Sequence, residues 1–391
     1  MGRSRIDISI AFLAGILLIA VAGVLIMVSA LRVDPVEEAV AEERIINVAL
    51  IVERSGKPAS TQLLMYYPGN ARAAMLDIPS ETGLIISSLN RVDSIDALYE
   101  PDDPRPFLDE VQRLTGATID WYLILDEGSL SSLVDLLDGI SVFLPERISD
   151  MVNEVPVSLP SGFVVLDGRK TLVYASYTQA DAMDSELVAK RQSLSQAALR
   201  RLGERSDYAM RDDVFPVMRS LFRTNLKPES LRRLFEEFVR LEADRIVLQR
   251  LTGANRYVEG KLLLFPYWDG ELVKDIVKQS LNALLNADAT AIADKVFTLE
   301  ILNGTATRGL AQKTADIFES FGYEVVSVGN AESSDVAKTS VIDRYGDLVS
   351  ATSVANVIRC KIVEAEAIPS ASPADFVIIL GKDFNGRNCG D

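Results

Sequence analysis

An uncharged apolar segment near the N-terminus constrains this chain more than any other feature. Residues Ile8–Leu31 form 24 consecutive positions without a charged side chain. At ~1.5 Å per residue, a helix of this length exceeds the ~30 Å hydrocarbon core of a bilayer. The segment therefore predicts one transmembrane helix. A cleaved signal peptide with Ala39-Val40-Ala41 as its processing site is the alternative, but the apolar region is long for that class.

Charges on the two sides of this segment predict its orientation. Arg3 and Arg5 precede it, and the acidic residues Asp34, Glu37, Glu38, Glu42 and Glu43 follow it. Basic residues collect on the cytoplasmic side of membrane proteins. We therefore expect residues 1–7 to be a cytoplasmic tail, residues 8–31 to span the cell membrane once, and residues 32–44 to be a charged linker. The bulk of the chain would then be extracytoplasmic or periplasmic.

Composition excludes several kinds of site. The chain contains no histidine, which removes Ser-His-Asp, Cys-His and histidine-ligated metal sites. Its two cysteines, Cys360 and Cys389, are too few for a cysteine-only zinc site. A net charge of −16 without a long basic run argues against nucleic acid as a partner. Any catalysis must rest on carboxylates, Arg, Lys, Ser, Thr or Tyr.

Hydrophobic patterning beyond the linker predicts an α/β fold. The run IINVALIV at Ile45–Val52 suits a strand buried on both faces. Strand and helix patterns then alternate, which indicates a mixed sheet covered by helices over residues 45–285. Strands are expected at Leu63–Tyr67, Ala73–Ile78, Ile119–Leu125, Ile140–Leu144, Phe163–Leu166, Ile246–Leu251 and Leu262–Phe265, and helices at Phe107–Leu114, Leu130–Leu137, from about Ser185, and at Pro228–Leu241 and Leu272–Leu285.

A second, smaller α/β domain is expected over residues 296–385, after a boundary at 286–295 and before a tail at 386–391. Its segment FTLEILNGTATRGLAQKTADIFESFGYEVVSVGNA predicts strand, turn, helix and strand. Asn303-Gly304-Thr305 resembles a phosphate-binding loop, but without Gly-Lys-Ser/Thr a tight strand-to-helix turn explains it better. Cys360 and Cys389 can form a disulfide or stay as two thiols. A disulfide requires their Cα atoms to lie within ~7 Å, a distance that the sequence does not give.

The apolar stripe of the Pro228–Leu241 helix has two interpretations. Its members are Leu231, Leu234, Phe235, Phe238 and Leu241. Such a stripe lines a lipid groove in some proteins. Apolar residues at helical spacing are far more often ordinary core, which is the interpretation favoured here.

The segment LDGRKTLVYAS…KRQ, between Leu166 and Gln192, resembles the LytR-CpsA-Psr family. Members of that family move glycopolymers from a polyprenyl-pyrophosphate lipid onto peptidoglycan. Four further stretches match family motifs in the correct order: LIVER, ASTQLLMYYPGNARAAMLDIPSET, SIDALY and IDWYLILDEGSLSSLVDLLDGISV. Five motifs in order make a chance match improbable. The second domain resembles the LytR C-terminal-type domain often appended to this family.

The resemblance assigns family roles to individual positions. The two metal-binding aspartates fall on Glu53 and Ser60, and the aspartate of S-I-P-R-D-T falls on Glu81. Arg191 and Gln192 match the end of R-x-x-R-Q. Neutral side chains stand at the remaining arginine positions, Ser80, Ser176, Thr178 and Val188. The pyrophosphate site that the resemblance implies has therefore lost most of its charge, and magnesium binding is expected to be weak.

Three hypotheses follow for the function. The first is a divergent envelope protein that binds a polyprenyl-linked or peptidoglycan-type ligand, through Lys190, Arg191 and Gln192, with little or no phosphotransfer. The second is an active phosphotransferase with a rebuilt site, in which Arg191, Gln192 and Glu81 are catalytic and Glu53 holds magnesium. The third is an envelope scaffold for partner proteins.

The topology is testable directly. Because of the length of the apolar segment and the charge asymmetry around it, we expect a reporter that is active only in the cytoplasm to be silent when fused after Asp391. A reporter that is active only outside the cytoplasm, fused at the same position, is the control. Activity of the cytoplasmic reporter, or a mature N-terminus near Glu42, would contradict the anchor.

Overall fold

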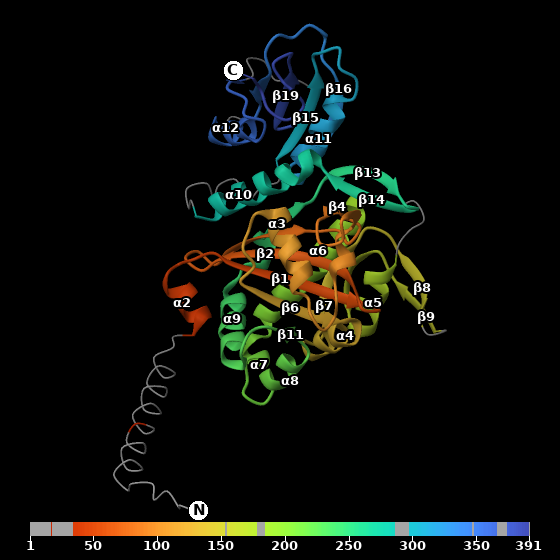
Figure 1. The fold of residues 1–391 in the computed structure, drawn as a ribbon, viewed down its shortest axis with the longest axis vertical. Coiled ribbons are helices and arrows are strands. Elements are labelled where there is room, and N and C mark those ends of the chain that lie inside the picture. The colour runs from red at the N-terminus through yellow and green to blue at the C-terminus, as the bar shows by residue number, and fades with distance from the viewer. Residues whose placement is uncertain are drawn as a thin grey trace, which may run out of the picture.

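The structure, a computed structural model, describes residues 17, 34–152, 155–177, 184–285, 297–345, 348–365 and 374–390. These residues form two α/β domains, with α10 (Glu271–Leu285) at their junction (Figure 1). Apart from Leu17, the predicted membrane-spanning segment lies outside the described residues, as does the expected boundary at 286–295. No helix within the described ranges is long and apolar enough to cross a bilayer.

A six-stranded mixed sheet organises the first domain, in the order β11-β6-β1-β2-β3-β12. Strand β1 pairs antiparallel with β2 and parallel with β6, while β3 pairs antiparallel with β2 and parallel with β12. The strands are β1 (Ile46–Arg54), β2 (Lys57–Tyr67), β3 (Arg72–Asp77), β6 (Trp121–Asp126), β11 (Arg223–Thr224) and β12 (Val247–Arg250). The mixed sheet predicted from the alternating pattern is confirmed.

Side chains that alternate along the central strands separate two hydrophobic cores. Val48 and Leu64 face one core, whereas Ala49, Leu63 and Met65 face the other. Successive residues of a strand point to opposite faces, so a strand buried on both sides must be apolar at nearly every position. This requirement explains the continuous apolar run of β1.

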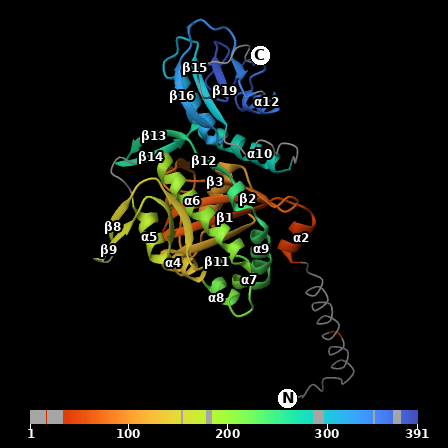
Figure 2. The same ribbon diagram turned by 180° about the vertical axis from the view of Figure 1, so that it is seen from behind.

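Helices cover both faces of the sheet. One face carries α2 (Pro35–Ala41), α4 (Glu127–Leu136), α5 (Gly168–Ser176), α6 (Asp184–Glu204), α7 (Ser206–Ala209), α8 (Phe215–Ser220) and α9 (Pro228–Arg240). The other face is covered by η1 (Ile95–Leu98), α3 (Arg105–Thr115) and α10. Figure 2 shows α6 lying across the first of these faces.

Short elements join this framework. They are the hairpins β4 (Gly83–Ile86) with β5 (Arg91–Ser94), β8 (Ile148–Val152) with β9 (Val155–Leu159), and β13 (Gly253–Val258) with β14 (Lys261–Pro266), together with the pair β7 (Ile140–Leu144) and β10 (Gly162–Leu166) and the turns η2 (Ala243–Arg245) and η3 (Tyr267–Gly270). The sequence pattern did not predict β4, β5, β8, β9 or β13. Two-stranded ribbons bury little apolar surface, so they carry a weak periodic signal.

The predicted linker contains a docked helix. Asp34 caps α2 by accepting hydrogen bonds from the backbone N–H groups of Val36 and Glu37, and Pro35 suits the first turn. Val36 is buried beside α9. The charged linker over residues 32–44 stays a prediction. Within it, the acidic residues of α2 lie on the exposed side of a helix whose other side is apolar.

The second domain contains a five-stranded sheet in the order β16-β15-β19-β17-β18. Its elements are β15 (Thr298–Asn303), α11 (Leu310–Ser320), β16 (Glu324–Asn330), β17 (Ser340–Asp343), α12 (Leu348–Val357), β18 (Val363–Ala365) and β19 (Phe376–Leu380). The loop after β15 is closed on itself, since the Asn303 side chain binds the backbone of both Thr305 and Thr307. This geometry favours the tight turn over the phosphate loop.

Contacts between the two domains centre on Trp268. The charged groups of Lys313 and Arg387 are 5.5 and 5.0 Å from the centroid of its ring. Arg387 also pairs with Asp275 of α10. Trp268 has φ 51°, a left-handed conformation that a side chain of this size seldom adopts. Cation–π contacts from the second domain stabilise the ring in this position, and the ion pair with Asp275 holds Arg387 beside it.

The two cysteines are close together in the second domain as free thiols. The Cys360 thiol donates to the Thr339 carbonyl at 3.1 Å. A hydrogen bond with the Cys389 thiol lowers the pKa of Cys360 to about 7, which increases its thiolate fraction at neutral pH. The disulfide stays a prediction.

We expect oxidised glutathione to convert both thiols into a Cys360–Cys389 disulfide with the loss of two protons and two electrons to the oxidant. Loop closure should stabilise the second domain by about 3–4 kcal/mol on the chain-entropy estimate. Thiol titration and the melting temperature measure the two effects. Cys389→Ser is the control, and two thiols that persist after oxidation would contradict the prediction.

Candidate functional site

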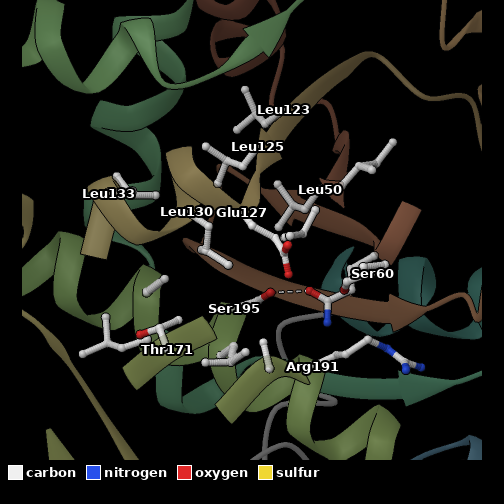
Figure 3. Close-up of a pocket in the computed structure, with 18 of the residues that line it drawn as sticks. Leu50, Ser60, Leu123, Leu125, Glu127, Leu130, Leu133, Thr171, Arg191 and Ser195 are labelled. Atoms are coloured by element: carbon white, nitrogen blue, oxygen red, sulfur yellow. Dashed lines mark hydrogen bonds between the residues drawn. The ribbon is translucent and has the colours of Figure 1, made fainter. Parts of the chain in front are cut away.

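A cavity of about 280 Å³ lies between the first sheet and the helices of its α6 face (Figure 3). Strands β1, β2 and β6 form one wall, and helices α4, α5, α6 and α9 form the others. Polar residues at the carboxyl end of β1 and the start of β2, Arg54 and Ser60, are part of its lining. A concave, mostly apolar site with a few polar groups is the usual form of a ligand pocket.

Leucine and phenylalanine side chains from distant parts of the sequence build the apolar part of the cavity. They include Leu50, Leu123, Leu125, Leu130, Leu133, Leu194, Phe222, Phe235 and Phe238. Phe235 and Phe238 belong to the α9 stripe that was predicted to be core. They are 5% and 1% exposed, so that prediction is correct, yet they also line the cavity. The two interpretations of the stripe are thus compatible.

Paired polar groups line the other end. Arg54 donates from Nε to Glu127 Oε1 at 2.5 Å, and both side chains border the cavity. Ser195 Oγ donates to the Gln62 amide oxygen, drawn as the dashed line in Figure 3. Ser60 lies on β2 opposite Val52 and also borders the cavity.

Arg191, the arginine that matches the family motif, is bound to Asp77. Its Nε and Nη2 donate to the two carboxylate oxygens of Asp77 at 3.0 and 2.5 Å. The Asp77 side chain is fully buried, and the Arg191 side chain is 20% exposed. Figure 3 shows the guanidinium of Arg191 directed away from the leucines. The bidentate pair therefore uses the face of the guanidinium that a phosphate would otherwise bind.

Burial controls the electrostatics of this pair. Desolvation raises the pKa of Asp77, and the hydrogen bonds from Arg191 and Gln62 oppose that rise. Removing one partner of a buried ion pair leaves an uncompensated charge, which costs more than the pair itself contributes. Asp77 and Arg191 therefore depend on each other, and a ligand that withdrew Arg191 would leave Asp77 without its counterion.

The neighbours of Arg191 on α6 face different surroundings. Gln192 is buried and donates to the Gln249 carbonyl at 2.6 Å, so it ties α6 to β12. Val188 is buried in the protein interior. Neither residue borders the cavity, whereas Leu187, Lys190 and Arg191 do. The structure therefore separates Gln192 from the site to which the resemblance assigned it.

Glu53, at the position of the first metal-binding aspartate, is paired with a cation of the chain itself. Arg223 Nη2 donates to Glu53 Oε2 and lies 3.4 Å from the Tyr99 hydroxyl. Burial, followed by the charge of Glu53, raises the pKa of Tyr99 to about 12, which keeps that hydroxyl protonated.

The residues present do not fit a resident magnesium ion. The guanidinium of Arg223 lies against the Glu53 carboxylate, and the second carboxylate position is Ser60, which carries no charge. Magnesium sites in proteins rely on carboxylates and phosphates. Across the described ranges, no group of three or more His, Cys, Asp or Glu residues is placed to hold a metal ion.

The other predicted site residues are dispersed. Ser80 donates to the Pro58 carbonyl, and Ser176 donates to the Leu172 carbonyl at 2.8 Å and borders the cavity. Glu81 is exposed and does not border the cavity. Thr178 lies outside the described residues. Of the ten predicted positions, the structure brings Ser60, Ser176, Lys190 and Arg191 to the cavity.

Lys190 lies at the rim formed by α5 and α6. Its ammonium group donates to the Tyr177 carbonyl and lies 5.4 and 5.3 Å from the ring centroids of Tyr174 and Tyr177. Burial lowers the pKa of Lys190, and the charge of Glu186 opposes that shift. The structure thus places a half-buried cation on aromatic faces next to the cavity.

Sequence reasoning missed Asp77 and Arg223, which pair with two of the four charged site residues that were predicted, Arg191 and Glu53. One signal was available for Asp77, because this acid stands at the first serine of S-I-P-R-D-T within an apolar strand. An acid in such a strand needs a buried partner. Arg223 carried no signal, since 170 positions separate it from Glu53.

Comparisons with known proteins agree with this fold. A solved structure of Bacillus subtilis TagV is 18% identical and has a TM-score of 0.55, covering 61% of this chain and 98% of its own. A structure described as TagT bound to LIIa-WTA is 18% identical and has a TM-score of 0.51, covering 62% and 91%. At these identities the likeness shows a shared fold.

Sequence comparisons identify the family. A polyisoprenyl-teichoic acid–peptidoglycan teichoic acid transferase, TagU of Bacillus licheniformis, is 21% identical over 237 residues, which are 59% of this chain and 75% of the relative. The model described as LytR cell envelope-related transcriptional attenuator matches residues 297–384. The LytR_cpsA_psr family model matches residues 48–279, more than half of the chain. The chain therefore belongs to the LytR_cpsA_psr family.

Proposed function

We propose that this protein binds the apolar chain of a polyprenyl-type envelope lipid and catalyses little or no phosphotransfer. The observation that carries the proposal is the bidentate Asp77–Arg191 pair beside an intact apolar cavity. The apolar cavity of about 280 Å³ supports the proposal as the place for such a chain. The arginine that should meet the phosphate is already neutralised by a buried carboxylate of the same chain.

The chemistry of phosphotransfer supports this proposal. Negative charge builds on the pyrophosphate oxygens in the transition state, and enzymes stabilise it with arginines and metal ions. Here Ser80 and Ser176 are neutral, and their hydroxyls donate to backbone carbonyls. Each charge-assisted hydrogen bond is worth roughly 1.5–3 kcal/mol. Losing several of them lowers the rate by orders of magnitude.

The proposal includes the absence of a resident magnesium ion. Arg223 supplies the positive charge beside Glu53, so binding a dication there would require displacement of a guanidinium. The ion pair stabilises the fold between β1 and β11, but it activates no leaving group. Glu53 is accordingly proposed as structural rather than as a metal ligand.

The relatives support the class of ligand. The curated relative is named for a polyisoprenyl-linked teichoic acid and for peptidoglycan, and one solved neighbour is described with LIIa-WTA bound. We extend only the lipid part to this chain, because the cavity that would hold it is present. With residues 8–31 as an anchor, we propose that the cavity faces the extracytoplasmic side of the cell membrane, where such lipids are presented.

The first test is activity. The full-length protein in nanodiscs should release no sugar phosphate from a polyprenyl-pyrophosphoryl sugar, with or without magnesium, because the site lacks the charges that the reaction requires. Product release measured by mass spectrometry checks this. Robust magnesium-dependent transfer that Arg191→Ala abolishes would contradict the proposal and favour the rebuilt enzyme.

The second test concerns the cavity. Ala198 borders it from α6, so Ala198→Phe should fill it and weaken binding of the uncharged lipid geranylgeraniol at least tenfold. Ala189 is exposed on the same helix, and Ala189→Phe is the matched control. Fluorescence competition measures both affinities. Equal binding by wild type and Ala198→Phe, or no binding by either, would contradict a lipid cavity and favour the scaffold.

A further inference from the structure

The formal charges of the side chains that border the cavity do not sum to zero once their ion-pair partners are included. The charged side chains are Arg54, Glu127, Lys190 and Arg191. Arg54 is paired with Glu127, and Arg191 is paired with the buried Asp77. Both pairs lie at hydrogen-bonding distance and cancel in charge. Lys190 has no carboxylate within ion-pair distance among the described residues, so the polar end of the cavity carries one net positive charge.

We infer that the cavity selects a lipid whose head carries a single negative charge, a phosphodiester, and that Lys190 binds it. This inference rests on the proposed function, since the cavity must first hold the lipid chain. One cation neutralises one phosphodiester, whereas a pyrophosphodiester would bring two negative charges into a partly desolvated site. A buried charge without a partner is costly, so the second charge would weaken binding.

The position of Lys190 suits this role. Its neighbours on α6, Leu187 and Leu194, border the apolar part of the cavity, while its ammonium group reaches the rim at Tyr177. A lipid chain that lies along the leucines would thus end its apolar part near the ammonium group. The Tyr174 and Tyr177 rings hold that group in place through their faces.

The surroundings of Lys190 favour a bound anion. Burial disfavours the charged form of the lysine and lowers its pKa. Glu186 is one turn away on the same helix, but it is exposed to solvent and forms no ion pair with Lys190 within the described part of the chain. An anion at the rim would compensate the desolvated ammonium at close range. Two of the three ammonium protons remain for it after the Tyr177 carbonyl has accepted one.

The test compares lipid probes that share one geranylgeranyl chain. The full-length protein in phosphatidylcholine nanodiscs is titrated with geranylgeraniol, geranylgeranyl-phosphoryl-glucose and geranylgeranyl-pyrophosphoryl-glucose. We expect the phosphodiester to bind about tenfold more tightly than the alcohol, as one charge-assisted hydrogen bond provides, and more tightly than the pyrophosphodiester. Phosphatidylglycerol, added as a competitor, distinguishes a polyprenyl source of the phosphodiester from a diacylglycerol source.

A pair of variants separates the head site from the chain site. Lys190→Gln should remove the preference for the phosphodiester over geranylgeraniol, whereas Lys278→Gln, at an exposed lysine of α10, should leave that preference as it is in the wild type. Tighter binding of the pyrophosphodiester, or equal binding of the phosphodiester and the alcohol, overturns the inference while the lipid cavity stands. Failure of geranylgeraniol itself to bind overturns the proposed function as well.

Discussion

The buried ion pair between Asp77 and Arg191 is the interaction on which the rest of the site depends. It joins β3 to α6 at the place where the cavity ends, and Gln62 and Ser195 extend it into a hydrogen-bonded network. A buried carboxylate is stabilised by a counterion, and Arg191 supplies it to Asp77. A single acid in an otherwise apolar strand thereby gives a motif arginine a partner within the fold, which is the basis of the proposal that Arg191 does not stabilise a transition state.

The Glu53–Arg223 pair is a second ion pair within the chain. It lies at the position that the family resemblance assigns to the first metal-binding aspartate. A carboxylate that the family resemblance assigns to a metal holds a guanidinium instead. Arg191 and Glu53 are thus each paired with a residue of the same chain, one with an anion and the other with a cation. The apolar wall needs no such replacement, because its leucines and phenylalanines also belong to the core that covers the sheet. The cavity wall therefore contributes to the stability of the fold whether or not the protein catalyses phosphotransfer.

The sequence predicted the fold more completely than the site. The apolar run of β1 and the stripe of α9 both lie where their periodicity placed them, because burial on a sheet or under a helix leaves a local pattern. Ion pairs and hydrogen bonds between residues that are far apart in the sequence leave no local periodicity. Arg191 matched its motif, yet its function depends on Asp77, 114 positions away. Gln192 also matched and faces β12, since a motif specifies residue order but not side-chain direction.

On the role that we infer for Lys190, the site changes its ligand without changing its fold. Strand β1 and helices α5 and α6 fix the position of the cavity rim. The charged side chains on these elements then determine which lipid head the rim can bind. Among the described residues, the other charged side chains that border the cavity form two ion pairs within the chain. The half-buried ammonium group of Lys190 is the proposed anion site, and its carbonyl and aromatic contacts would restrict where that anion can lie. Binding an uncompensated charge in a desolvated site costs free energy. A site with one positive charge would therefore bind a lipid with one phosphate in preference to a lipid with two. Specificity of this kind follows from charge balance and requires no catalytic group.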